Sequence, residues 1–403
     1  MATLSRKRGP APAPEVPVER KEPAAVQFFA TCPRGLAGAL AEELASFGAT
    51  ELKAGEAGVE FEGPFELAYT VNLESRLATR ILARLAKFDY RNENDIYLGA
   101  KNVRWHAHFG VDRTFKVETN SVKAPVKSLD FITLKVKDAI ADVFRDALGR
   151  RPDVSPRTPD VRVHVFLDAK WCTLYLDTSG EPLFKRGRRD RTGEAPLKKN
   201  LAAGLLRLAG WTPEQPLLDP MCGAGTILIE AAEMALGLAP GRGRPFGFEK
   251  LTRFDAPAWE KVKAASESRA QPVAPRRIFG SDLYGRTVDA ARANLRDMGL
   301  EGVVTLKQVN LLELSAPAPA GLLVTNPPYG VRLGEKEDLA QFYPELGHLL
   351  KQKFAGWTAY IFSGDPELPK RIRLSATKRT VLYNGAIECR LYEYRMVAGG
   401  NRP

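Results

Sequence analysis

The chain has 403 residues, of which 44% are hydrophobic, so it can bury two or three cores. Its 59 basic and 48 acidic residues leave a net charge of +11, which favours an anionic partner. No apolar run is long enough to span a membrane, and the four scattered cysteines form neither a disulfide framework nor a metal-ligand pattern. His106 and His108 have no acidic or cysteine partner nearby. A cytoplasmic protein without a membrane segment or a bound metal is therefore expected.

The N-terminal part of the chain predicts a tail followed by a small α+β unit. Residues 1–25 are rich in Pro, Ala and charged side chains, lack the apolar core of a signal peptide, and are expected to be disordered. Apolar spacings over 26–95 predict a unit that we interpret as a scaffold. Its expected elements are a strand at 26–30, a helix at 36–47, a strand at 59–63 and a helix through 65–86.

A second unit, with a basic surface, is predicted over 96–182. About half of its basic residues are expected to be the ordinary solvated face of a helix, and the others suit an anionic partner. These basic residues are Lys101, Arg104, Arg113, Lys116, Lys123, Lys127, Lys135 and Lys137. The expected elements are a strand at 115–119, a helix capped by Asp130, and a hairpin of strands at 161–167 and 171–176.

The third unit is predicted over 183–403, and positive charge is densest at its start, where the second unit joins it. Lys185, Arg186, Arg188 and Arg189 lie within one short segment that also contains a glycine, so the segment is expected to lie outside any core. Arginine pairs with phosphate through two parallel hydrogen bonds, and we interpret the segment as a phosphate contact. The alternative is a flexible linker.

A glycine turn between a strand and a helix predicts the first part of a ligand site. The apolar run that ends at Asp219 is followed by Gly223, Gly225 and Thr226, after which an apolar helix is expected. Glycine lets the backbone approach a ligand closely, and a helix N-terminus favours a negative group. Because the third glycine of the dinucleotide fingerprint and the lysine of a P-loop are missing, a nucleoside-like ligand without a pyrophosphate is expected.

Two further strands are expected to end in polar residues at the same edge of a sheet. Asp282 ends one run, as the ribose-binding acid does in nucleotide-binding α/β folds, and Asn310 ends the next. The long segment 238–274, between the glycine turn and Asp282, contains several Arg, Phe and Trp side chains. It is expected either to pack on the sheet or to form part of the substrate entrance.

The sequence Asn326-Pro327-Pro328-Tyr329 follows the apolar run 321–324 and predicts the second part of the site. Two prolines stiffen the loop and remove two backbone donors, which leaves carbonyl oxygens free to accept. The Asn oxygen and such a carbonyl can hold the two hydrogens of an exocyclic amino group while the Tyr ring stacks on the base. The nitrogen lone pair is then free to attack an electrophile. Taken alone, Asn-Pro-Pro is equally compatible with an ordinary turn.

Together these motifs resemble those of class I S-adenosylmethionine-dependent methyltransferases, and specifically the THUMP-containing large-subunit rRNA guanine-N2 methyltransferases. The resemblance runs from Val26 to Val397 and includes the stretches 31–36, 183–187, 195–203, 219–226, 326–334 and 383–391. It implies an α/β fold in which a ferredoxin-like α+β unit and a THUMP RNA-binding domain precede a Rossmann-like methyltransferase domain. Some members have a second methyltransferase domain, and this chain resembles the single-activity form.

The resemblance also implies the cofactor and the role of each site residue. S-adenosylmethionine would lie in a pocket shaped by Gly223, Gly225 and Thr226, with Asp219 close to its amino group. Asp282 would accept both ribose hydroxyls. Asn310 would meet the adenine edge, although family members often have an acid there. Asn326, the Pro327 carbonyl and Tyr329 would hold the target base in the loop that Pro328 completes.

The implied reaction is transfer of a methyl group to the N2 amino group of a guanine in 23S rRNA, either free or in a pre-ribosomal particle. Three alternatives remain open at this point. A tRNA guanine-N2 methyltransferase can share both domains, a DNA adenine-N6 methyltransferase uses the same four-residue loop, and an RNA-binding assembly factor would lack catalysis.

Overall fold

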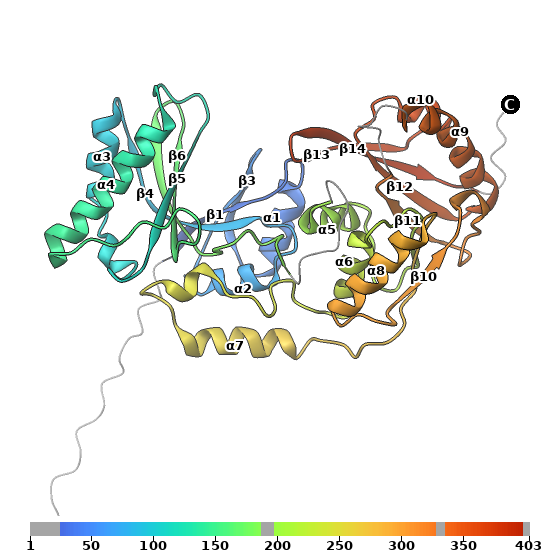
Figure 1. The fold of residues 1–403 in the computed structure, drawn as a ribbon, viewed down its shortest axis with the longest axis horizontal. Coiled ribbons are helices and arrows are strands. Elements are labelled where there is room, and N and C mark those ends of the chain that lie inside the picture. Colours follow the sequence, from blue (N-terminus) through green and yellow to red (C-terminus); the bar gives the residue numbers. More distant parts are fainter. Residues whose placement is uncertain (1–24, 187–196, 328–334, 398–403) are drawn as a thin grey trace, which may run out of the picture.

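A computed structural model describes residues 25–186, 197–327 and 335–397. Within these residues the chain forms two seven-stranded sheets, which Figure 1 shows in the left and right halves of the molecule. In the same part of the chain, no helix combines the length and the apolar character needed to cross a membrane.

The two N-terminal units share one continuous sheet. In spatial order its strands are β2 (Thr50–Ala54), β3 (Gly58–Gly63), β1 (Val26–Thr31), β4 (Arg80–Asp89), β7 (Trp171–Asp177), β6 (Val161–Leu167) and β5 (Phe115–Ser121). Strand β4 pairs antiparallel with β1 over Arg80–Ala83 and with β7 over Leu82–Asp89, so it belongs to both units. The helices are α1 (Ala37–Ser46), α2 (Leu67–Glu74), α3 (Glu93–Lys101), η1 (Trp105–Ala107) and α4 (Leu129–Leu148).

The prediction of a helix through 65–86 is wrong beyond its first half, because α2 ends at Glu74. Helix α2 ends directly before Ser75, whose backbone is extended. The Glu43 carboxylate accepts hydrogen bonds from the Ser75 hydroxyl at 2.6 Å and from the Arg76 amide at 2.9 Å, so this amide has a partner outside the helix. The following residues form β4, because pairing with strands on both sides outweighs the helical spacing of their apolar side chains.

The cap predicted for the long helix is also corrected. Ser128, not Asp130, caps α4, and its hydroxyl accepts a hydrogen bond from the Phe131 amide at 3.2 Å. Asp130 lies in the first turn, where its negative charge favours the helix dipole. The predicted apolar face is present, since Ile132 and Val136 are fully buried against the sheet.

The C-terminal sheet has the order of an open α/β fold. Its strands are β10 (Val304–Gln308), β9 (Ile278–Asp282), β8 (Leu217–Asp219), β11 (Gly321–Thr325), β12 (Trp357–Ser363), β14 (Ile387–Arg395) and β13 (Lys378–Asn384). The first five are parallel, and β14 is antiparallel to both of its neighbours. The strand order reverses between β8 and β11, and open α/β sheets bind ligands at the carboxyl ends of strands at such a reversal. The helices are α5 (Lys199–Leu208), α6 (Thr226–Ala235), α8 (Gly285–Asp297), η3 (Leu311–Glu313), α9 (Glu335–Lys353) and α10 (Leu368–Arg371).

The segment 238–274 packs on the N-terminal half of the molecule. It contains η2 (Gly247–Lys250) and α7 (Ala256–Glu267), and Figure 1 shows α7 in yellow below α2. The Tyr69 ring of α2 lies 4.6 Å from the Phe248 ring and 6.1 Å from the Trp259 ring, between centroids. Of the two alternatives that the sequence leaves open, packing on the C-terminal sheet does not hold for these aromatic side chains, which are buried against α2, and a place at the substrate entrance stays a prediction.

Buried ion pairs join the N-terminal half to α6. Arg76 Nη1 lies 3.4 Å from a carboxylate oxygen of both Glu230 and Glu233, which are 0% and 1% exposed. Arg186 Nη2 lies 2.6 Å from Glu230, and Arg242 Nη1 lies 2.6 Å from Glu233. Residues three apart on a helix share one face, so both carboxylates point to the same junction.

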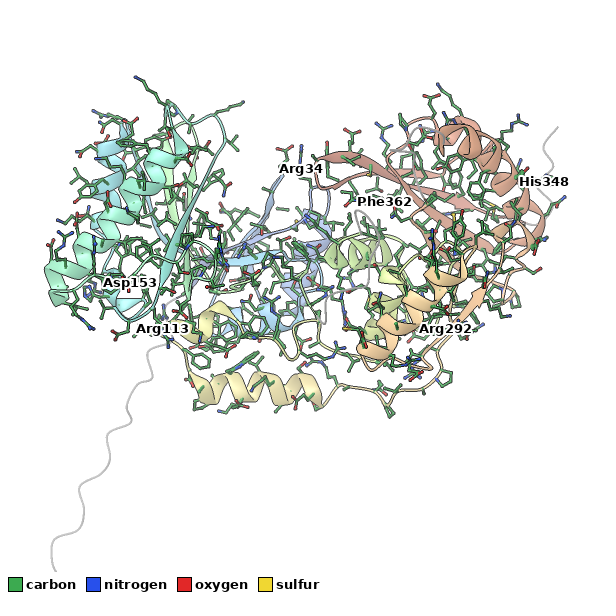
Figure 2. The ribbon with its side chains drawn as sticks, viewed as in Figure 1. Arg34, Arg113, Asp153, Arg292, His348 and Phe362 are labelled. Atoms are coloured by element: carbon green, nitrogen blue, oxygen red, sulfur yellow. The ribbon has the colours of Figure 1, made fainter. Side chains whose placement is uncertain are left out.

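A second contact joins the two halves at the other end of the junction. The Arg34 guanidinium lies 4.1 Å from the centre of the Tyr383 ring, and Figure 2 shows Arg34 beside the β13 end of the C-terminal half. Gly35 has a φ of 93°, and a Cβ there would lie 2.4 Å from the Val381 carbonyl oxygen. The close approach of the loop that contains Gly35 to strand β13 therefore requires glycine.

Candidate active site

The predicted site residues of the C-terminal sheet meet at the carboxyl edge of its parallel strands. Strand β8 ends at Asp219, β9 ends at Asp282, and β11 ends at Thr325, directly before Asn326. Strand β8 pairs with both β9 and β11, so the three strand ends are neighbours. The structure thus brings the glycine turn, the second acid and the Asn-Pro-Pro loop to one place.

The glycine turn leaves space for a ligand on one side. Gly223 and Gly225 have φ angles of 53° and 85°, which residues other than glycine rarely adopt. No described heavy atom lies within 4 Å of the position that a Cβ would take at Gly223. At Gly225 that Cβ would lie 3.2 Å from the Ala291 Cβ, so this glycine packs closely on α8 just before Thr226 begins α6.

Asp282 is hydrogen-bonded to the glycine turn. Its two carboxylate oxygens accept hydrogen bonds from the Gly223 and Tyr284 amides, both at 3.1 Å. Each carboxylate oxygen has two lone pairs, so capacity for ribose hydroxyls remains. Asn310 lies two residues after the end of the neighbouring strand, β10, and caps η3; its Oδ1 atom accepts a hydrogen bond from the Leu312 amide at 3.0 Å. The Asn310 amide nitrogen donates no hydrogen bond to a described residue, so it is available to a ligand.

Asp219 is almost fully buried behind the turn. Its Oδ1 accepts hydrogen bonds from the Thr325 hydroxyl at 2.8 Å and from the Met221 amide at 3.3 Å. Burial raises the pKa of the Asp219 carboxyl to about 7; these hydrogen bonds oppose the rise, and the charge of Asp282 adds to it. Thr325 is a site residue that the sequence analysis misses, and its one signal is its place directly before Asn326. Its hydroxyl links the two strands at the reversal of strand order.

The raised pKa of Asp219 predicts a pH dependence of stability. The folded ligand-free protein binds a proton at Asp219 more tightly than the unfolded chain, so this group stabilises the fold fully below its unfolded pKa, about 3.9. That contribution is lost as the pH rises through about 7. We expect Asp219→Asn, which cannot ionise, to gain stability relative to wild type between about pH 5 and about pH 8. Urea unfolding at both pH values measures the difference, and parallel pH profiles would contradict the assignment.

The Asn326 side chain has an unsatisfied acceptor. Its Oδ1 atom is buried and accepts no hydrogen bond from the residues that the structure describes. An unpaired buried polar atom costs about 1–3 kcal/mol, so such an atom beside a ligand site indicates a group that a ligand satisfies. Pro327, which follows, is buried. Pro328 and Tyr329 lie outside the described residues.

The expectation for Arg186 is corrected. Its side chain is buried, and its Nε and Nη2 atoms donate to the two carboxylate oxygens of Glu230 at 3.2 and 2.6 Å. Arg186 therefore belongs to the junction and is not available to phosphate. Lys185 is exposed and forms an ion pair with Glu181 at 3.1 Å. Arg188 and Arg189 lie outside the described ranges, so their phosphate contact stays a prediction.

Comparison with known families matches almost the whole chain. Residues 27–82 match the RlmL ferredoxin-like domain, residues 90–177 match the THUMP domain, and residues 186–393 match the RMKL-like methyltransferase domain. The chain belongs to the RMKL-like methyltransferases. The expected combination of ferredoxin-like, THUMP and class I methyltransferase domains is thereby confirmed.

Two curated relatives of this RMKL-like methyltransferase differ in length. A Synechocystis protein, slr0064, provisionally named an RNA methyltransferase, is 38% identical over 92% of this chain and 96% of its own length. The ribosomal RNA large subunit methyltransferase K/L of a Shewanella species is 40% identical over 94% of this chain and 54% of its own. The chain thus spans about half the length of this K/L relative.

Solved structures agree on the fold, and one of them contains the product of the cofactor. SMU.472, a protein provisionally named a methyltransferase, was solved with S-adenosylhomocysteine. Its structure has a TM-score of 0.84 with this one at 30% sequence identity, and the match covers 92% of this chain and 98% of the SMU.472 chain. A Listeria monocytogenes protein, described as a predicted N6-adenine-specific DNA methylase, has the same TM-score and identity over 92% of this chain and 96% of its own. S-adenosylmethionine is therefore the cofactor of this RMKL-like methyltransferase. The described residues fit it, with open space beside Gly223, the Asp282 carboxylate and the Asn310 amide at one edge.

Proposed function

We propose that this RMKL-like methyltransferase transfers a methyl group to the exocyclic N2 amino group of a guanine in 23S rRNA. The proposal depends chiefly on the buried Asn326 Oδ1 atom, an acceptor without a partner among the described residues, at the edge where the cofactor-binding residues meet. The THUMP domain supports an RNA substrate. The K/L relative, whose name states large-subunit ribosomal RNA, supports the ribosomal one.

The cofactor would supply a methyl group activated by a sulfonium, so the protein has to orient the target amine and exclude water. The methyl–sulfur bond would break as the nitrogen–carbon bond forms, S-adenosylhomocysteine would leave, and the methylated nitrogen would then release one proton to solvent. The guanine N2 lone pair is delocalised into the ring, which makes it a poor nucleophile. Asn326 Oδ1 and the Pro327 carbonyl would accept hydrogen bonds from the two hydrogens of the N2 amino group. These bonds favour a pyramidal nitrogen and stabilise the positive charge that develops there. Tyr329 would stack on the base, which has to be unpaired or flipped to enter.

The remaining site residues would position the cofactor. Asp282 would accept the ribose hydroxyls while it stays hydrogen-bonded to Gly223, so it would tie the ribose to the turn. Asn310 would donate its amide hydrogens to the adenine edge. Asp219 is only 2% exposed, and we therefore place it behind the methionine pocket, where its hydrogen bond with Thr325 would fix the start of the Asn-Pro-Pro loop.

The test is transfer from deuterium-labelled S-adenosylmethionine to three polymers, followed by mass spectrometry of the nucleosides. The polymers are 23S rRNA from cells that lack the protein, tRNA from the same cells, and duplex DNA. We expect labelled N2-methylguanosine in 23S rRNA alone. Label in tRNA guanine or in DNA adenine would replace the proposed substrate, and the assignment of the Listeria protein makes the DNA arm necessary. Cofactor binding without label in any polymer would favour a non-catalytic assembly factor.

A further inference from the structure

The N-terminal sheet opens at a defined point in β4. Strands β1 and β4 pair only as far as Phe28 and Ala83, although both strands continue past these residues. The pairing of β4 with β7 shifts register between Arg84 and Ala86, which is a β-bulge. A bulge bends its strand and redirects its side chains, and bulges are frequent beside functional sites. Strand β4 thus diverges from β1 where the ferredoxin-like unit meets the THUMP domain.

Two adjoining hollows follow the diverging part of β4. Their volumes are about 520 and 410 Å³, and both are lined by Lys87 and His108. The larger hollow also contacts Arg84 and, from the segment after η2, Arg253. The smaller one also contacts Arg104. We call the two hollows together the β4 groove. Figure 1 places β4 in the left half of the molecule, apart from the C-terminal sheet and its site.

The β4 groove is lined by cations and by no described carboxylate, while Arg84 also borders an adjacent hollow whose lining includes Glu51, Glu60 and Glu62. Among the described residues, its lining includes Arg84, Lys87, Arg104 and Arg253 and no carboxylate, and none of the four forms an ion pair. The pKa of His108 is lowered, first by burial and then by the charges of Arg253 and Arg104, so positive charge is concentrated around it. Unpaired cations in a concave, partly apolar surface favour a polyanion.

Two of the groove's cations lie over aromatic rings. The Arg253 guanidinium lies 4.8 Å from the centre of the Phe65 ring, and the Lys87 amine lies 5.4 Å from the centre of the Trp171 ring. When a guanidinium lies flat against a ring, its N–H groups point away from the edge of the ring, where they can donate hydrogen bonds to phosphate oxygens. Ala25, the first described residue, lines the groove. Residues 1–24, which precede it in the sequence, include five basic and three acidic side chains, so their net charge has the same sign as that of the groove and makes them an unsuitable occupant.

We infer that the β4 groove binds the sugar-phosphate backbone of the RNA substrate at a distance from the methylated base. This inference rests on the proposed RNA substrate and adds the surface that holds it. Phosphate contacts fix the register and orientation of a nucleic acid without reading its sequence. The groove would therefore orient the RNA, while the Asn-Pro-Pro loop selects the base.

The experiment replaces the three exposed cations of the groove together, in Lys87→Ala/Arg104→Ala/Arg253→Ala. We expect the affinity for a 23S rRNA transcript, measured by fluorescence anisotropy, to fall by about ten- to a hundredfold. The slope of log affinity against log salt should become shallower by about 2, close to 0.7 for each lost phosphate contact on a single strand. Cofactor affinity and the thermal unfolding midpoint should stay at their wild-type values.

A matched control removes three exposed cations of the C-terminal half in Arg277→Ala/Lys351→Ala/Lys378→Ala. Arg277 directly precedes β9, Lys351 lies on α9 and Lys378 begins β13. This variant loses the same charge but should retain RNA affinity within about twofold and keep the wild-type slope, because it removes no phosphate contact. Equal effects of the two triple variants would overturn the inference. So would a groove variant that binds RNA normally, or an effect that disappears when residues 2–24 are deleted. If the groove variant loses RNA affinity but the wild-type protein methylates no rRNA, the proposed function is wrong and the inference that the groove binds RNA still holds.

Discussion

Asn326→Ala is expected to slow methyl transfer by about a hundredfold or more, as for loss of one hydrogen bond made in the transition state. The change removes the buried Oδ1 acceptor and leaves the glycine turn and Asp282 intact. Cofactor affinity should therefore stay close to that of wild type. Single-turnover transfer to 23S rRNA that lacks the modification measures the rate, and calorimetry measures cofactor binding.

Asp282→Ala is the complementary control for this experiment. It removes a charged acceptor of the ribose hydroxyls and should weaken cofactor binding by about 1–3 kcal/mol. The two variants then separate loss of amine orientation from loss of cofactor. If Asn326→Ala transfers methyl groups at the wild-type rate, its unpaired oxygen has no role in catalysis and the Asn-Pro-Pro sequence is only a turn.

Arg186→Ala is expected to destabilise the protein by about 3 kcal/mol, near the lower end of the cost of breaking a buried ion pair. The change leaves the Glu230 carboxylate buried without the arginine that donates a hydrogen bond to each of its oxygens, although Arg76 remains 3.4 Å away. Urea denaturation measures the loss. Because Arg186 does not face solvent, the salt dependence of RNA binding by the folded variant should match that of wild type.

Two neighbouring substitutions serve as controls for Arg186. Lys185→Ala removes an exposed ion pair with Glu181 and should cost less than about 1 kcal/mol. Arg188→Ala/Arg189→Ala should leave stability unchanged and lower the salt slope of RNA binding by about 1, as the sequence predicts for phosphate contacts. A normal stability for Arg186→Ala, together with a shallower salt slope, would restore Arg186 to the RNA-binding surface.

The chemistry at the edge of the C-terminal sheet was predictable because it depends on short-range signals. The three strands that carry the site, β8, β9 and β11, are largely apolar runs, and Asp219, Asp282 and Asn326 each lie at or directly after the end of one of them. Parallel pairing places these ends side by side whatever lies elsewhere in the chain. The glycine turn is equally local, since the positive φ of Gly223 and Gly225 follows from the residue type that the sequence shows.

The junction and the N-terminal sheet depended on partners that are distant in the sequence. Arg186 and Glu230 are 44 residues apart, so a charged segment gave no sign that one arginine pairs with a buried carboxylate. The strand at 80–89 has helical apolar spacing and becomes a strand because β1 and β7 supply backbone partners on both sides. The aromatic residues of 238–274 bury against Tyr69 for the same reason, since a side chain packs where the folded chain places its complement. Local pattern thus determined what the site contains, and long-range pairing decided how the RNA-binding half is held against it.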